Sequence, residues 1–297
     1  MRKLYIQDDW DQFVLLDKNE FYIIDYKSFV YDVNNPAIIV ATRGYSDVEF
    51  QYYIDLKRES EIKLHMKLKS LSNIKVPDIM FSNTDAALYR HMDINKNYML
   101  KTLWQARSLG KAVVNLELML RISEDLTYDD FDCEKFNRKY KLDLGETRDN
   151  TEKCILFNSL KNYNYYLQDL VEFDKEYRVL YFTGSDIYDY VVEEREGYSV
   201  LDNRERKHSV ITAKYIPEFI LNSIKDFGDK SGCPALSFDI AYNKELNTWY
   251  VFEYSVQFGI QYDTDTLNKI KKQFTKAMIL KYDEVKKEMK WKQKDTF

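Results

Sequence analysis

The sequence predicts a mixed α/β (α+β) fold made of several packed subdomains. Its 297 residues are enough for two or three subdomains with sizeable buried cores. Short apolar runs bounded by turn residues are typical of strands, and other segments carry apolar residues at helical spacing. The chain also has 25 Tyr and 17 Phe against 8 Gly and 4 Pro, a balance that favours well-formed strands with few flexible linkers.

The first predicted domain, residues 1–80, is a small α/β unit. Phe21–Asp25 and Ala37–Ala41 are short apolar runs, so we expect both to form strands. The polar stretch Asp47–Leu71 carries apolar residues at helical spacing and is expected to be helical. Pro77 marks the boundary, because the residue before a proline is disfavoured in a helix.

The second predicted domain covers residues 81–182. A short helix is expected over Asn83–Met92, with Asp85 in its first turn. Residues 117–160 are polar and mixed, and we expect an irregular or partly helical insertion there. The expected strands are Tyr98–Trp104, Ala112–Leu116, Tyr165–Val171 and Glu176–Phe182.

The third predicted domain covers residues 183–297. Pro217 fits the first position of a helix that Gly228 or Gly232 would close. A second helix is expected from about Thr266. The expected strands are Ile187–Val192, Ala235–Tyr242 and Thr248–Phe258.

Composition argues against several classes of protein. The net charge is −5, with 44 basic and 49 acidic residues, so a dedicated nucleic-acid binder is disfavoured. The Lys-rich segment Lys281–Lys294 is expected to be a solvated helical tail. The three cysteines have no metal-ligand spacing, and we expect no disulfide. Without a signal-like or membrane-spanning apolar run, the protein is expected to be soluble, reduced and cytoplasmic.

The last two predicted strands each carry a carboxylate on a polar face. In the first strand, alternation places Asp239 on the face opposite to that of its apolar neighbours. In the second strand, Glu253 and Ser255 both lie on the polar face. A hairpin centred on Glu245 would set Asp239 opposite Val251 and make Glu253 its diagonal neighbour, roughly 7–8 Å away. Such a pair could hold Mg²⁺, although carboxylates on a solvent-facing side are the ordinary alternative.

These two strands resemble the metal-binding hairpin of the ATP-grasp superfamily. Those enzymes show a strand with Asp, a turn, and a strand with Glu-x-Asn that hold the magnesium of ATP. Here Ser-Phe-Asp-Ile-Ala-Tyr and Val-Phe-Glu-Tyr-Ser occupy the two strands, with Ser in place of Asn. The resemblance implies an ATP-grasp fold that binds ATP and Mg²⁺, with Asp239, Glu253 and Ser255 as metal ligands.

Tyr-Tyr-Leu-Gln-Asp-Leu-Val, residues 165–171, resembles the adenine hinge of the same superfamily. By that match Gln168 replaces the usual hinge acid. The main chain of Asp169 and Val171 would meet the adenine edge, and Leu170 and Val171 would line its apolar slot.

The strand after the hinge resembles the ribose and phosphate strand. Glu176 would accept hydrogen bonds from the ribose hydroxyls. Arg178, on the same face, would direct its guanidinium group towards the phosphates. An exposed Glu176–Arg178 ion pair is the alternative.

Upstream, residues 98–114 resemble the strand, phosphate loop and strand that open the ATP-binding subdomain. Lys101 matches the strand lysine that reaches the phosphates. The loop has a single Gly, so Arg107, Ser108 and Lys111 would supply side-chain contacts instead of main-chain N–H groups. A plain turn without a phosphate role is the alternative for each of them.

The superfamily resemblance implies an ADP-forming ligase that joins a carboxylate to an amine through an acylphosphate. Its partners would be ATP and a carboxylate, peptide or protein acceptor, with no membrane. Arg178 and Arg206 are the expected catalytic cations. The other cations considered for the acceptor side are Arg195, Arg204 and Lys207, and His208 is a candidate acid–base residue. A kinase acting on a hydroxyl and an inactive nucleotide-binding module remain the alternatives.

Overall fold

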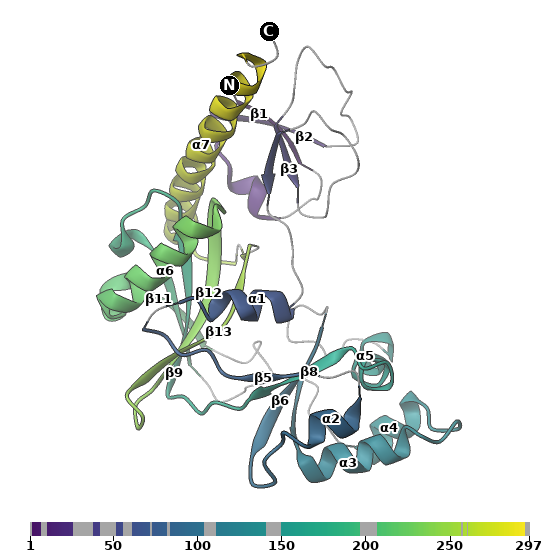
Figure 1. Ribbon diagram of the computed structural model, residues 1–297. Coiled ribbons are helices and arrows are strands. Elements are labelled where there is room, and N and C mark those ends of the chain that lie inside the picture. Colours follow the sequence, from purple (N-terminus) through teal and green to yellow (C-terminus); the bar gives the residue numbers. More distant parts are fainter. Residues whose placement is uncertain are drawn as a thin grey trace.

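The computed structural model describes residues 2–6, 11–25, 38–41, 52–55, 61–71, 73–81, 84–103, 111–140, 150–196, 207–256, 258–259 and 261–294 (Figure 1). Within these residues the chain forms three β-sheets, each with helices packed against it. The predicted mixed α/β class is confirmed.

The N-terminal sheet is parallel, with the strand order β2-β1-β3-β4. Its elements are β1 (Arg2–Ile6), the short helix η1 (Asp11–Leu15), β2 (Phe21–Asp25), β3 (Ile38–Ala41) and β4 (Tyr52–Asp55). Both predicted strands of this unit are therefore confirmed. The helix expected over Asp47–Leu71 is wrong in its first part, because the aromatic and β-branched run at Tyr52–Asp55 pairs with β3. The helix α1 covers Glu61–Leu68.

The second sheet is antiparallel, with the order β5-β8-β6-β7. Its strands are β5 (Ile79–Met80), β6 (Asn97–Thr102), β7 (Lys111–Asn115) and β8 (Tyr165–Asp169). One face of this sheet packs on helices α2 (Asp85–Tyr89), α3 (Leu116–Asp125), α4 (Cys133–Lys139) and α5 (Asn150–Lys161). The described part of the 117–160 insertion is thus more helical than expected. Asn115 and Asp132 cap α3 and α4 through their side chains.

Cys133 in α4 and Cys154 in α5 form a disulfide, with their Cα atoms 5.5 Å apart. The expectation of reduced cysteines is therefore wrong for this pair. A separation of 21 residues gives no signal in the sequence, because the two cysteines meet only once the helices pack together.

The third sheet is antiparallel, with the order β11-β10-β9-β12-β13. Its strands are β9 (Lys175–Phe182), β10 (Val191–Glu196), β11 (Lys207–Ile211), β12 (Ala235–Asn243) and β13 (Thr248–Ser255). Helix α6 (Glu218–Ser231) packs on one face. Pro217 precedes its first residue, and Gly232 ends it at φ 70°, as predicted. The strand expected over Ile187–Val192 is wrong at its start, where the 3-10 turn η3 (Ile187–Asp189) precedes β10.

The long helix α7 (Thr264–Lys294) joins the N-terminal sheet to the third sheet. It runs beside the N-terminal strands (Figure 1). Leu4 and Ile6 of β1 share a core with Leu180 of β9 and with Phe274 of α7. The domain boundaries at residues 80 and 182 stay predictions. Among the described helices, none combines the length and the apolar composition that crossing a bilayer requires.

Gly228 in the middle of α6 is required by close packing. A Cβ atom placed there would meet the Tyr181 ring at about 2.5 Å, and that ring is held by a hydrogen bond from its hydroxyl to Asp229. We expect Gly228→Ala to lower the free energy of unfolding by about 1–3 kcal/mol, because overpacking outweighs the better helix propensity of Ala. Denaturant titration measures this. Asn222→Ala, at an exposed position of α6, is the control and should be neutral or stabilising. Equal stability of the two variants would contradict the packing argument.

Candidate functional site

One face of the third sheet carries a band of charged side chains. The register sets Arg178 of β9 between Glu193 of β10 and Asp239 of β12. The alternate residues Val179 and Phe238 are buried under α6, so the charged residues point to the other side of the sheet.

Asp239 is the centre of this band. Arg178 donates to both of its carboxylate oxygens, with Nε–Oδ1 2.8 Å and Nη2–Oδ2 2.9 Å. Arg195 approaches the same carboxylate, with Nη1 3.4 Å from Oδ1. The Asp239 side chain is 12% exposed, so two guanidinium groups surround a nearly buried carboxylate.

These contacts govern the ionisation of Asp239. Burial by itself raises the pKa of Asp239, but the charges of Arg178 and Arg195 outweigh burial and hold that pKa well below its usual range. The carboxylate is therefore ionised at neutral pH and can act as a ligand for a cation.

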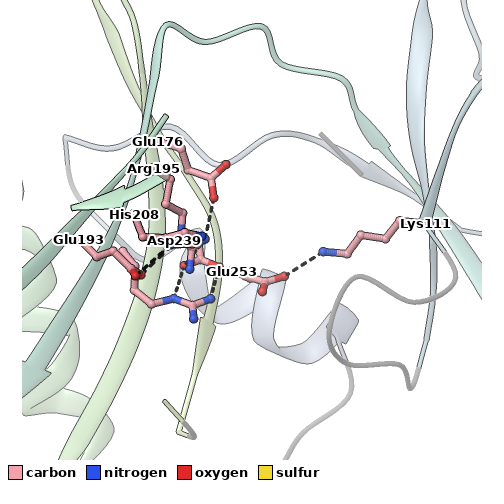
Figure 2. Close-up of polar contacts among 8 residues, drawn as sticks. Lys111, Glu176, Glu193, Arg195, His208, Asp239 and Glu253 are labelled. Carbon is pink, nitrogen blue, oxygen red and sulfur yellow. Dashed lines mark hydrogen bonds and ion pairs between the residues drawn. The ribbon is translucent and has the colours of Figure 1, made fainter. Parts of the chain in front are cut away.

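Arg195 connects Asp239 to two further carboxylates (Figure 2). Its Nη1 donates to Glu176 at 2.7 Å, and its Nε lies 3.5 Å from a Glu193 oxygen. His208 of β11 completes the band, with Nδ1 2.9 Å from Glu193. The structure thus brings together Glu176, Arg178 and Arg195 from the predicted set.

A β-bulge in β13 brings Glu253 next to Asp239. The predicted register is wrong: Asp239 pairs directly with Glu253, and Ile240 pairs with Val251, so Phe252 is the extra residue. The two carboxylates are therefore direct neighbours across the strands rather than diagonal ones. The bulge also changes the facing of the residues before it: strict alternation from Glu253 would place Val251 on the polar face, but Val251 joins the core under α6.

Two lysines of the second sheet face this band. Lys111 of β7 lies 3.7 Å from Glu253, and Figure 2 shows it reaching across from the neighbouring sheet. Lys101 of β6 pairs directly with Lys111 in the register and is 8% exposed. In a strand, Leu100 and Thr102 point to the opposite side from Lys101. Leu100 packs on the helices, so Lys101 lies on the face of the sheet away from them.

Gln168 of β8 lies on the same face of the second sheet. Its neighbour Leu167 is buried under the helices, which directs Gln168 to the other side. Its side chain is almost fully buried, yet its amide nitrogen has no hydrogen-bond partner among the described residues. An unpaired buried amide costs free energy.

The predicted hinge residues Asp169, Leu170 and Val171 line a cleft of about 500 Å³. The rest of its lining is Lys75, Val76, Pro77, Asp78, Glu172, Asn243, Glu245, Leu246 and Tyr250. The Asp169 N–H donates to the Asp78 carbonyl at 2.9 Å, which ties the hinge to the segment before β5.

Several predicted residues fall outside the described part of the chain. Arg107 in the phosphate loop and Arg204 and Arg206 in the β10–β11 connection lie there, and the side chain of Lys207 is not described. Of the cations considered for the acceptor side, Arg195 is placed in the band.

The donor set suits Mg²⁺ bound together with phosphates. In the described part of the chain no group of three or more His, Cys or acidic side chains could hold a metal ion. Asp239 and Glu253 oppose each other, and Ser255 comes two residues later on β13, opposite Ser237. Mg²⁺ usually takes one or two carboxylates with substrate phosphates and waters, so this set fits the ion.

Glu193 belongs to the band, although we did not predict it. Its signal was the same alternation that identified Glu176 and Arg178, because Glu193 and Arg195 are also two residues apart on one strand. The predicted strand ended at Val192, whereas β10 continues to Glu196, so this pattern lay outside the prediction.

No protein-family model matches the chain, and no curated protein sequence matches it. Solved structures do match in fold. The ATP-grasp ligase PsnB, complexed with a minimal precursor, gives a TM-score of 0.56 at 10% identity and covers 93% of this chain and 99% of its own. The macrocyclase MdnC of Microcystis aeruginosa MRC, bound with precursor peptide MdnA, gives a TM-score of 0.52 at 10% identity and covers 92% of this chain and 98% of its own.

A third similar structure comes from a different kind of ligase. The D-alanine–D-alanine ligase of Bacillus anthracis gives a TM-score of 0.52 at 11% identity and covers 98% of this chain and 99% of its own. Identities this low establish the fold rather than the activity. The chain has the ATP-grasp fold that these ligases share.

Proposed function

We propose that this protein is an ATP-dependent ligase that joins a carboxylate to an amine through an acylphosphate, with ATP and Mg²⁺ bound between its second and third sheets. The observation that carries the proposal is the direct pairing of Asp239 and Glu253 within a band of arginines. Similar structures have been solved with Mg and ADP (PsnB) and with ATP (the Bacillus anthracis ligase), which supports this choice of cofactors.

The residues around the band can hold each part of the nucleotide. Gln168, Leu170 and Val171 would hold the adenine at the hinge, and Glu176 would accept from the ribose hydroxyls. Lys101 would meet the phosphates from the second sheet.

The charges of the band suit phosphoryl transfer, which needs positioned cations more than covalent help. Mg²⁺ would neutralise charge on the phosphates while held by Asp239 and Glu253, with Ser255 as a further oxygen ligand. With the ion held there, Asp239 would bind Arg178 and Arg195 less strongly, so that their guanidinium groups would be available to contact the phosphates, and Lys111 would become available from Glu253 in the same way.

The acceptor is proposed to be a carboxylate on a peptide, a protein or a small molecule. PsnB and MdnC have been solved with precursor peptides, which favours a peptide acceptor here. Arg195 of the band and Arg206 would stabilise the oxyanion that develops when the amine attacks. His208, whose Nδ1 lies 2.9 Å from Glu193, would accept the amine proton.

Product analysis tests the proposed reaction. The protein is incubated with ATP, Mg²⁺ and a mixture of peptides and amines, and products are followed by mass spectrometry and phosphate assay. We expect ADP, free phosphate and a new product whose mass is that of an acid plus an amine minus water. Phosphate retained on the acceptor would instead show a kinase, and ATP binding without turnover in any mixture would show an inactive module.

The metal role of the carboxylates gives a separate prediction. Calorimetry should show ATP binding that depends on Mg²⁺ in the wild-type protein. The gain in ATP affinity on adding Mg²⁺ should be about tenfold smaller in Glu253→Gln and in Asp239→Asn than in the wild-type protein, because each variant loses one anionic ligand.

Asp226→Asn is the matched control, since this exposed carboxylate lies on α6 on the other side of the sheet. Far-UV circular dichroism should confirm that each variant is folded, because Asp239→Asn leaves two arginines without their shared anion. Unchanged Mg²⁺ dependence in folded Glu253→Gln and Asp239→Asn would overturn the metal site.

A further inference from the structure

Gln12 of η1 is a buried side chain that bonds to the main chain just beyond β13. It is 1% exposed, and both ends of its amide are paired. Its Nε2 donates to the Val256 carbonyl at 3.2 Å, and its Oε1 accepts from the Phe258 N–H at 3.0 Å. The amide therefore holds the chain at two points, one directly after Ser255 and one three residues after it.

The residues next to Gln12 belong to an apolar core, where an amide is costly unless it is bonded. Phe13 and Leu16 of η1 are buried in this core together with Phe258. A methionine of similar length could fill the space of Gln12, since apolar packing has no preferred direction. Hydrogen bonds are directional, so what Gln12 adds is a fixed position of the main chain at Val256 and Phe258.

The segment that carries Gln12 is itself anchored to α7. The Asp17 N–H, just after η1, donates to Thr275 Oγ1 at 3.1 Å. The ring centres of Phe13 and Phe274 are 6.2 Å apart. Gln12 thus ties the end of β13 to η1, and through η1 to the long helix α7.

Ser255 is the side chain whose position this anchor affects most. It is the last residue of β13, and the register with β12 ends at its pairing with Ser237. One rotatable bond separates its oxygen from the main chain, so the oxygen moves with the main chain. An asparagine has a second torsion and could compensate for a displaced main chain, whereas a serine has none to use.

We propose that Gln12 is a positioning residue for the metal site, where it keeps the Ser255 hydroxyl within reach of Mg²⁺ by holding the main chain beyond it. The assignment rests on the proposed function, in which Ser255 is an oxygen ligand beside Asp239 and Glu253. It adds a contribution from a residue that lies 244 positions before Val256 in the sequence. Because Gln12 is buried, it would act through Ser255 and not by contact with the ion.

Calorimetric titrations with ATP, with and without Mg²⁺, test the assignment. Gln12→Met fills the same space but makes neither bond. Its gain in ATP affinity on adding Mg²⁺ should be about fivefold smaller than that of the wild-type protein, because the hydroxyl ligand is displaced. ATP affinity without Mg²⁺ should stay the same. Gln12→Asn, which is one carbon shorter and cannot reach both groups, is a second variant and should show the same loss.

Combined variants show whether Gln12 acts through Ser255. Ser255→Ala should show the same loss as Gln12→Met, and the two changes together should cause no further loss, because residues that act as one unit are not additive. Ser255→Asn should restore most of the gain in the Gln12→Met background, since its second torsion lets the amide oxygen reach the ion.

Leu16→Val is the matched control, because it removes a methylene from the same core on the same short helix. It should lower stability and leave the Mg²⁺ dependence of ATP binding unchanged. Hydrogen exchange of the metal-free protein checks the contact itself. Relative to the amides of β9, the Phe258 amide should exchange about fivefold faster in Gln12→Met than in Leu16→Val.

The outcomes separate this assignment from the proposed function. Three results would overturn the role of Gln12 alone: an unchanged Mg²⁺ gain in folded Gln12→Met or Gln12→Asn, an unchanged gain in Ser255→Ala, or losses that add in the double variant. A wild-type protein whose ATP binding does not depend on Mg²⁺ would overturn the metal site of the proposed function as well.

Discussion

The ion cluster around Asp239 is the constraint on which the rest of the site depends. Arg178 and Arg195 would be costly to bury without an anion, and Asp239 would be equally costly without them. The cluster is satisfied only if β9, β10 and β12 keep their register, since each strand contributes one of the three charges. The same charges then determine what the site can bind: anionic phosphates to the arginines and a metal ion to the carboxylate.

The bulge in β13 is the second constraint, because it sets the distance between the two carboxylates. A regular β13 could not keep both pairings, because Val251 opposite Ile240 would set Glu253 opposite the buried Phe238, and Glu253 opposite Asp239 would turn Val251 out of the core. With the extra residue Phe252, Asp239 and Glu253 face each other while Val251 and Tyr254 both pack under α6. The packing of one face and the chemistry of the other are thus linked through a single inserted residue.

Local pattern was sufficient for much of this fold and of the site. Alternation placed Asp239 and Glu253 on polar faces, and Pro217 and Gly232 bounded α6, because these signals act within a few residues. The bulge could not be predicted, because a two-residue alternation pattern does not show where an extra residue is inserted. Here the position of the insertion depends on packing against α6, which is a tertiary contact. The Cys133–Cys154 disulfide joins two helices whose packing no local pattern indicates, so it could not be predicted either.

A crystal structure grown with Mn²⁺ and ADP tests the central claim most directly, because anomalous scattering locates the metal. The account predicts a metal peak bonded to Asp239, Glu253 and a phosphate oxygen, with the adenine at Gln168 and with Arg178 or Arg195 turned from Asp239 to a phosphate. A peak away from both carboxylates, or phosphates that contact neither arginine, would contradict it.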